Sequence, residues 1–189
     1  MEYPIDLSMT TASEVLELPN GKAVRVGKMK LRFIGWHGSK EFLNTLPRTL
    51  SIKPLVSFRN SAVFAEIALV RMFEAAAWKA WWVDSFHRRY RADMPPAATS
   101  LPEPLAYIMK TVRERYRQVG DAGPERHARR GEFGGAWDVV CWNGWRALFV
   151  EAKLARKDRV RPSQIAWLQA ALEIGVSADS FLIAEWEIE

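Results

Sequence analysis

The stretch from Trp137 to Lys153 constrains the fold of this chain more than any other. It consists of two largely apolar runs on either side of the pair Asn143-Gly144. An Asn-Gly pair between two such runs is the strongest short-range signal for a β-hairpin, because both residues of a two-residue turn then have positive φ. We therefore predict two adjacent antiparallel strands joined by a two-residue turn.

Three charged side chains share one face of this predicted hairpin. Side chains alternate along a strand with period 2, which puts Asp138, Glu151 and Lys153 on the same side. With a two-residue turn, Asp138 faces Phe149 and lies diagonally from Glu151, about 7–8 Å away. Taken alone, Glu151 and Lys153 are typical of a surface salt bridge. Two acids and a lysine on one face flanked by apolar residues favour a metal site instead, because one hard cation can bridge the two carboxylates.

The other patterns along the chain predict helices that alternate with strands. A second Asn-Gly pair, Asn20-Gly21, predicts a hairpin between 15–18 and 22–26, and 30–34 alternates as a further strand. A helix is predicted to begin at Ser61, which can cap it, and to give way to an aromatic strand at 78–83. Further predicted elements are helices at 105–118 and from Pro162 to just before Gly175, and a strand at 181–186. This order favours an α/β fold, with a mixed β-sheet flanked by helices.

Length and composition set the expected domain organisation. The 189 residues, of which 49% are hydrophobic, suit one domain with a smaller N-terminal unit. We predict a hairpin-containing N-terminal extension at 1–58 and a main domain at 59–189, with a Pro-rich and helical insertion at about 93–130. No apolar run is long enough for a transmembrane helix, and the N-terminus lacks a signal-peptide pattern. The single cysteine, Cys141, is expected to be a small buried hydrophobe, and a cytoplasmic location is the expectation.

The charge distribution is compatible with a polyanionic partner. The formal net charge is +5 and the sequence pI is about 9.5. Basic residues gather in three clusters, one of them directly after Lys153. Each cluster alone is typical of a solvated face, but three beside an acidic site favour nucleic-acid binding. The candidate nucleic-acid-binding residues are Arg88, Arg89, Arg129, Arg130, Arg156, Lys157, Arg159 and Arg161.

The order of the charged residues resembles the PD-(D/E)xK nuclease superfamily. Asp138 is followed thirteen residues later by Glu151-Ala152-Lys153, and Trp137 stands where the family name has proline, at a variable position. The run from Phe149 to Lys153, followed by 161–168 and a glycine-stopped helix, is similar to the VRR-NUC branch. The resemblance covers about 61–186. It implies a restriction-endonuclease-like mixed sheet flanked by helices, here with a small β-rich N-terminal extension.

The resemblance also implies a ligand set and a cofactor. Mg²⁺ or Mn²⁺ would be held by Glu66, Asp138, Glu151 and the backbone carbonyl of Ala152. Glu66 is assigned as the family's helix glutamate, and Glu74, two turns further along, is its rival.

The implied activity is metal-dependent endonucleolytic hydrolysis of phosphodiester bonds in DNA. Lys153 would orient the attacking water, and Gln164, at the start of the following helix, would support the site. Branched or flapped DNA is the implied substrate class, and a small stand-alone domain of this type can form a homodimer. Two alternatives stay open: a catalytically silent nucleic-acid-binding module of the same fold, and a nuclease directed at RNA. A zinc site is not indicated, because the three histidines lie far apart and there is one cysteine.

Overall fold

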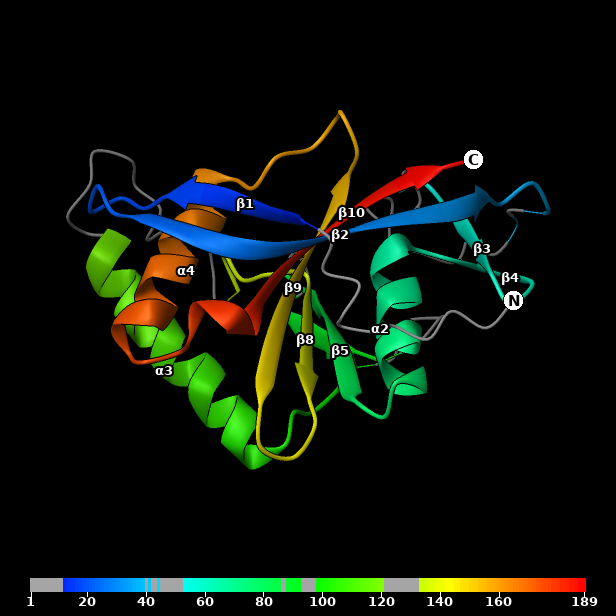
Figure 1. Ribbon diagram of the computed structural model, residues 1–189. Helices are drawn as coiled ribbons and strands as arrows, with labels where there is room; N and C mark the ends of the chain where they lie inside the picture. Colours follow the sequence, from blue (N-terminus) through cyan, green and yellow to red (C-terminus); the bar gives the residue numbers. More distant parts are fainter. Residues whose placement is uncertain are drawn as a thin grey trace.

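The computed structural model describes residues 12–39, 41, 44, 53–85, 88–92, 98–120 and 133–189, and in these ranges the chain is a mixed α/β protein. Its strands form one open sheet, and its helices pack against the faces of that sheet (Figure 1). The strands are β1 (Ala12–Glu17), β2 (Ala23–Gly35), β3 (Val56–Phe58), β4 (Ser61–Val63), β5 (Lys79–Asp84), β6 (Arg89–Arg91), β7 (Ala98–Thr99), β8 (Val139–Trp142), β9 (Ala147–Leu154) and β10 (Phe181–Ile188). The helices are α2 (Ala65–Ala75), α3 (Glu103–Gly120), α4 (Pro162–Glu173) and the short 3-10 helix η4 (Ala178–Ser180).

The sheet runs in the order β4-β3-β2-β10-β9-β8-β5-β6-β7, and β1 pairs with β2 beside this path. Strand β10 is parallel to both of its neighbours, β2 and β9. The other pairings among the described strands are antiparallel. The sheet is therefore mixed, as the sequence predicts, and it is mostly antiparallel.

Helices cover both faces of the sheet. Helix α2 lies on one face, and α3 and α4 lie together on the other (Figure 1). In β5, Trp82 packs in the α2-side core, whereas Trp81 and Val83 pack in the core beneath α3 and α4. Central strands that are buried on both faces read as continuous apolar runs, which explains why this segment shows little alternation. None of the described helices combines the length and the apolar character needed to cross a membrane.

The central hairpin forms, but its turn lies one residue further along the chain than predicted. Trp142 faces Ala147, and the Asn143 N–H donates to the Arg146 carbonyl at 3.3 Å, which leaves Gly144 and Trp145 between them. The prediction of a turn formed by Asn143 and Gly144 is wrong, because Gly144, with a φ of 103°, is its first residue and Asn143, without positive φ, precedes it. The Asn143 side chain instead accepts hydrogen bonds from two backbone N–H groups of the turn, as an Asx-turn does.

The displaced turn shifts the register of the hairpin by two residues. A shift of two leaves every side chain on its predicted face, since the period of a strand is two. It does change the partner of Asp138. The pairing of the two strands begins at Val139–Val150, and continuing this register by one residue puts Asp138 opposite Glu151 and not diagonally from it; the Asp138 N–H donates to the Glu151 side chain.

The N-terminal strands form one continuous element with the sheet. The hairpin around Asn20-Gly21 is confirmed, but the predicted strands at 22–26 and 30–34 are one long strand, β2. Strand β2 pairs in parallel with β10 near the centre of the sheet. The division of the chain at residue 58 stays a prediction.

The start of the first helix differs from the prediction. Ser61 does not cap a helix but begins β4, and α2 starts four residues later with Phe64 at its N-cap. A tight hairpin intervenes: Arg59 and Asn60, with φ of 48° and 59°, connect Phe58 to Ser61. Two successive positive φ values are the signature of a type I′ turn. The predictions of strand β5, helices α3 and α4 and strand β10 are confirmed, whereas β6 and β7 were not predicted.

Candidate active site

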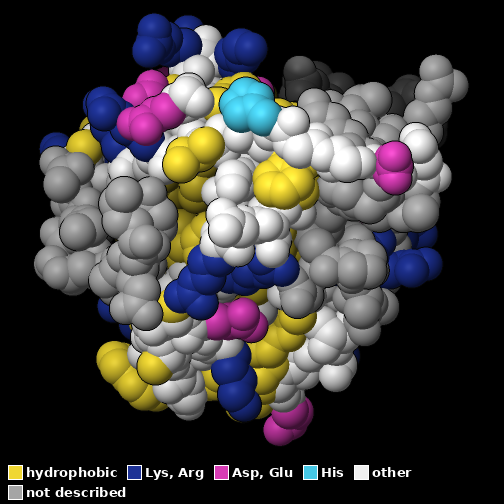
Figure 2. Space-filling model, turned by 90° about the vertical axis from the view of Figure 1, so that its right-hand side faces the viewer, with side chains coloured by type: hydrophobic (Ala, Val, Ile, Leu, Met, Phe, Trp, Pro, Cys, Tyr) yellow, Lys and Arg dark blue, Asp and Glu magenta, His cyan; other side chains and the backbone are white. Residues whose placement is uncertain are grey.

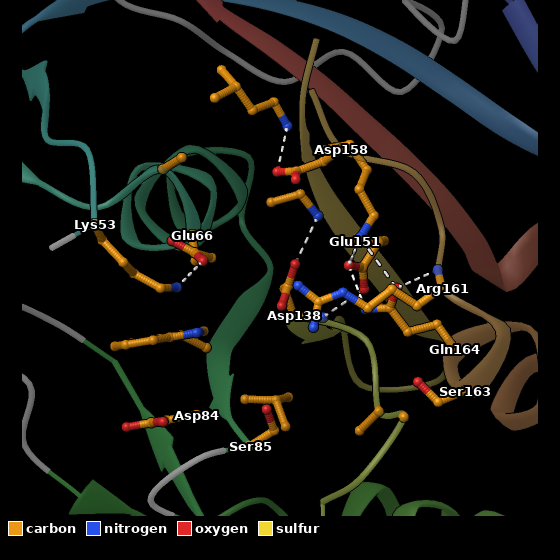
Figure 3. A pocket seen from close by; sticks show the side chains of 18 of the residues that line it. Lys53, Glu66, Asp84, Ser85, Asp138, Glu151, Asp158, Arg161, Ser163 and Gln164 are labelled. Atoms are coloured by element: carbon orange, nitrogen blue, oxygen red, sulfur yellow. Dashed lines mark hydrogen bonds and ion pairs between the residues drawn. The ribbon is translucent and has the colours of Figure 1, made fainter. Parts of the chain in front are cut away.

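The sheet splits at the pair Asp138–Glu151. Strand β9 continues past this pair to Leu154, whereas β8 begins only at Val139; its pairing with β5 extends one residue further, where the Val83 N–H donates to the Asp138 carbonyl at 2.7 Å. A pocket of about 650 Å³ opens at this split. Its lining comes from both helical layers, and Figure 3 shows its labelled residues from close by. They are Lys53, Glu66, Asp84, Ser85, Asp138, Glu151, Asp158, Arg161, Ser163 and Gln164.

The two acids of the hairpin hold each other in place through the backbone. The Asp138 N–H donates to Glu151 Oε2 at 3.3 Å, and the Ala152 N–H donates to Asp138 Oδ2 at 3.1 Å. Each carboxylate therefore accepts a hydrogen bond from a backbone N–H group on the other side of the hairpin. These bonds take the place of backbone–backbone hydrogen bonds between the strands. Their opposition follows directly from the hairpin register.

Helix α4 contributes the residue that joins the buried polar groups. Gln164 Nε2 donates to Glu151 Oε1 at 2.5 Å, and Gln164 Oε1 accepts from Lys153 Nζ at 3.1 Å. Lys153 Nζ also lies 2.7 Å from Glu151 Oε1. The same Gln164 oxygen accepts the backbone N–H of Arg161 at 2.9 Å, which anchors it to the first turn of the helix. The three side chains form a closed, buried network.

A tight loop fixes the position of α4 against the hairpin. Gly135 has a φ of 78°, and a Cβ on it would lie 2.5 Å from the carbonyl oxygen of Ser163. Trp137, which is fully buried, donates its indole N–H to the Gln164 carbonyl at 3.2 Å. A glycine at 135 is needed both for the left-handed backbone and for the close approach. The loop sets the distance between Gln164 and the two acids.

Burial and a neighbouring negative charge raise the pKa of each of the two carboxyl groups. Burial raises the pKa of Asp138 above its ordinary value, and the nearby Glu66 charge raises it further. Burial raises the pKa of Glu151 well above the usual range for glutamate, and the charge of Asp138 acts in the same direction. Lys153 opposes both shifts. A pocket with two acids of raised pKa is a functional-site candidate, because folding alone gains nothing from such a pair.

The opposite wall of the pocket is built around α2. Glu66 stands in the first turn of α2, and Lys53 Nζ donates to its Oε1. The Lys53 ammonium also lies 5.0 Å from the centre of the Trp82 ring and 5.8 Å from that of Phe64. Burial lowers the pKa of Lys53, but the charges of Glu66, Asp138 and Asp84 outweigh this and leave the pKa raised. In Figure 3 this pair lies across the pocket from Glu151, with Asp138 between the two walls.

Lys53 was missed in the sequence. It directly precedes Pro54, in a stretch without periodicity or motif, so no local signal marks it.

Nearby, Arg91 Nε donates to Asp84 Oδ2 at 2.8 Å, and both side chains are buried. The Arg91 guanidinium lies 5.8 Å from the centre of the Trp82 ring, which is therefore approached by two cations.

The structure brings the predicted acidic, lysine and glutamine residues into one pocket. Glu66, Asp138, Glu151, Ala152, Lys153 and Gln164 all line it. Glu74, the rival of Glu66, is exposed further along α2, and its charge acts instead on buried Cys141, whose thiol pKa is raised well above its ordinary value, mainly by burial. As the side chains stand, no three His, Cys, Asp or Glu groups of the described residues are arranged to hold a metal ion. The assigned roles stay predictions.

The predicted nucleic-acid-binding residues separate into several groups. Arg88 and Arg161 are exposed and line the pocket. Arg156, Lys157 and Arg159 line a second cavity of about 500 Å³, which shares Lys153 with the first. Arg89 is exposed on β6, and Arg129 and Arg130 lie outside the described residues. On the face shown in Figure 2, the Lys and Arg side chains that are drawn occur in separate places with Asp and Glu among them.

Comparisons with protein-family models, with curated proteins and with solved structures found no match to this chain. The chemistry of the pocket is therefore interpreted from its own residues and their contacts.

Proposed function

We propose that this protein is a metal-dependent nuclease of the PD-(D/E)xK kind, similar to the VRR-NUC branch and with a restriction-endonuclease-like fold, that hydrolyses phosphodiester bonds in DNA. One observation carries the proposal: Asp138 and Glu151 oppose each other where β8 and β9 part, and Lys153 and Gln164 are hydrogen-bonded to the same carboxylate. Two acids, a lysine and a glutamine come from three consecutive elements. They meet at the sheet end, inside a pocket.

The donor set of this wall fits a hard divalent cation. Mg²⁺ and Mn²⁺ prefer carboxylate and carbonyl oxygens, which Asp138, Glu151 and the Ala152 carbonyl can supply. The raised pKa values of Asp138 and Glu151 mean that burying these two carboxylates in their ionised form has a cost. A bound cation would remove that cost. When bound, the ion would polarise a phosphoryl oxygen and activate a water.

Lys153 supplies a positive charge next to the acids. The Lys153 side chain is 8% exposed, and its ammonium is held by both Glu151 and Gln164, so its position is set before substrate binds. From there it can orient an attacking water and stabilise the negative charge that develops on the phosphate. Gln164 is hydrogen-bonded to both the ammonium and the Glu151 carboxylate and so fixes their relative positions.

The exposed arginines of the pocket supply contacts for a polyanion. Arg88 and Arg161 lie at its wall, and the adjoining cavity carries Arg156, Lys157 and Arg159. Phosphate contacts of this kind provide affinity without sequence specificity. They favour a nucleic acid over a small phosphate ester as the substrate. The family resemblance adds branched or flapped DNA as the substrate class.

A cleavage assay tests the proposal. The purified protein is incubated with linear duplex, flapped and branched DNA and with RNA, in the presence of Mg²⁺ or Mn²⁺. We expect metal-dependent cleavage of DNA, and a loss of at least about 100-fold in Asp138→Asn and in Lys153→Met, because each removes a group that acts on the reacting phosphate.

Glu74→Gln is the matched control, since Glu74 is an exposed acid on α2 away from the pocket and should leave cleavage unchanged. DNA binding without cleavage by every protein, wild type included, would identify a silent binding module and refute the nuclease. Cleavage of RNA alone would reassign the substrate.

A further inference from the structure

The acid on the α2 wall already has a cation of its own. Lys53 donates to Glu66, and the Glu66 side chain is 13% exposed, so the ion pair is largely shielded from solvent. Glu66 also lies near enough to Asp138 for its charge to act on that carboxyl group. The ammonium of Lys53 is in the same electrostatic neighbourhood, since its charge acts on Asp138 as well. A positive charge therefore occupies the α2 side of the pocket without any metal.

The surroundings of Lys53 are built for a cation. Its ammonium lies over the rings of Trp82 and Phe64, which themselves pack with centres 5.9 Å apart. The negative faces of aromatic rings attract a cation, most strongly where water is partly excluded. Two aromatic rings and a carboxylate thus hold Lys53 in one place. A lysine whose task was only to solubilise the surface would have no such support.

The charge balance of the pocket favours one divalent ion over two. Glu66, Asp138, Glu151 and Asp158 carry four negative charges against the four positive charges of Lys53, Lys153, Arg88 and Arg161, and Asp84 and Arg91 cancel each other. One divalent ion therefore leaves an excess of two positive charges in the pocket. A second ion would double that excess in a pocket that is partly shielded from water, which is unfavourable.

We propose that Lys53 is a built-in cation that takes the place of a second metal ion beside Glu66, so that the pocket binds one divalent ion through Asp138 and Glu151. The inference rests on the proposed function and departs from the family-based assignment of Glu66 as a metal ligand. Lys53 is a positioning residue in this scheme: it neutralises Glu66 and limits the site to one ion.

The test is the number of Mn²⁺ ions bound per chain, measured by titration calorimetry and by electron paramagnetic resonance on the full chain without DNA. Wild type is expected to bind one Mn²⁺, and Lys53→Met, which keeps the length of the side chain, is expected to bind two. Lys53→Arg retains the cation and should bind one. Lys110→Met is the matched control, because Lys110 also pairs with an acid, Glu114, but both are exposed on α3 and outside this pocket. This variant should bind one.

Glu66→Gln gives an independent measurement should Lys53→Met fail to fold. Since Glu66 is not a ligand in this proposal, Glu66→Gln should bind one Mn²⁺ with a Kd within about twofold of wild type. Two ions in wild type, one ion in Lys53→Met, or a tenfold weaker Kd in Glu66→Gln would each overturn the proposal. Absence of Mn²⁺ binding together with absence of cleavage would instead refute the nuclease itself.

Discussion

Two lysine–glutamate pairs face each other across Asp138, and they are built in different ways. Glu151 and Lys153 are 1% and 8% exposed at their side chains and share Gln164 as a third partner. Glu66 and Lys53 are 13% and 33% exposed, and aromatic rings take the place of the third polar partner. The first pair is buried and hydrogen-bonded, whereas the second is partly open and held by packing.

The difference separates two tasks within one pocket. A buried pair with every polar atom engaged fixes an ammonium to within a narrow range of positions, as chemistry on a phosphate requires. A partly open pair held by one carboxylate and two rings neutralises charge with fewer polar contacts around it. We call the side of the pocket with Glu151, Lys153 and Gln164 the α4 wall, and the side with Glu66 and Lys53 the α2 wall. We expect changes to the α4 wall to lower stability more than the same changes to the α2 wall.

The largest expected effect comes from breaking the support of the α4 wall. Gly135→Ala should reduce the free energy of unfolding by about 3 kcal/mol, because the new Cβ meets the Ser163 carbonyl at 2.5 Å and the residue has positive φ. Denaturant unfolding measures this. Gly144→Ala is the matched control: its φ of 103° is also positive, but no atom lies within 4 Å, so it should lose only about 1 kcal/mol. Equal losses would show that crowding at Gly135 is unimportant.

A smaller effect is expected when each lysine is replaced by methionine. Lys153→Met leaves the buried Glu151 without its ammonium and should cost about 2 kcal/mol of unfolding free energy. Lys53→Met should cost about 1 kcal/mol, since Glu66 is more exposed and only one ion pair and the ring contacts are lost. Denaturant unfolding in EDTA compares the two. A larger loss in Lys53→Met would reverse the ranking of the two walls.

The smallest expected effect is a gain in stability. Asp138 and Glu151 have raised pKa values in the folded protein. The folded protein therefore binds protons at these two carboxyl groups more readily than the unfolded chain does. The stability from these groups is present below the ordinary carboxyl pKa of about 4 and is lost as the pH rises through the raised values. The free energy of unfolding of Asp138→Asn should therefore be about 1 kcal/mol higher than that of wild type at pH 7 in EDTA. Near pH 4 the two proteins should have the same free energy of unfolding.

Asp179→Asn controls for the general effect of removing an acid, because Asp179 is exposed on η4. It should leave the pH dependence of unfolding as it is in wild type. If Asp138→Asn proved less stable than wild type at pH 7, burial and the Glu66 charge would not destabilise the ionised Asp138 carboxylate as its surroundings indicate.

The two kinds of hairpin turn show where sequence patterns succeed and where they fail. The Asn143-Gly144 pair predicts a hairpin correctly but not which residues form its turn, since Asn143 precedes the turn and its side chain accepts hydrogen bonds from the turn backbone. The two-residue turn with two positive φ values is at Arg59-Asn60, where no glycine announces it. Turn type depends on how the flanking strands pair, and dipeptide preference is weaker than that constraint.

The sequence by itself determined that Asp138, Glu151 and Lys153 share one face, because strand periodicity holds for any turn that shifts the register by two. It also determined that α4 begins at Pro162, which brings Gln164 into the first turn of the helix. Only the tertiary structure decided that Lys53 meets Glu66 and that both face Asp138 across the pocket. Lys53 belongs to no helix or strand, so its partner is set by the packing of α2 and β5 around Trp82, and no local pattern encodes that packing.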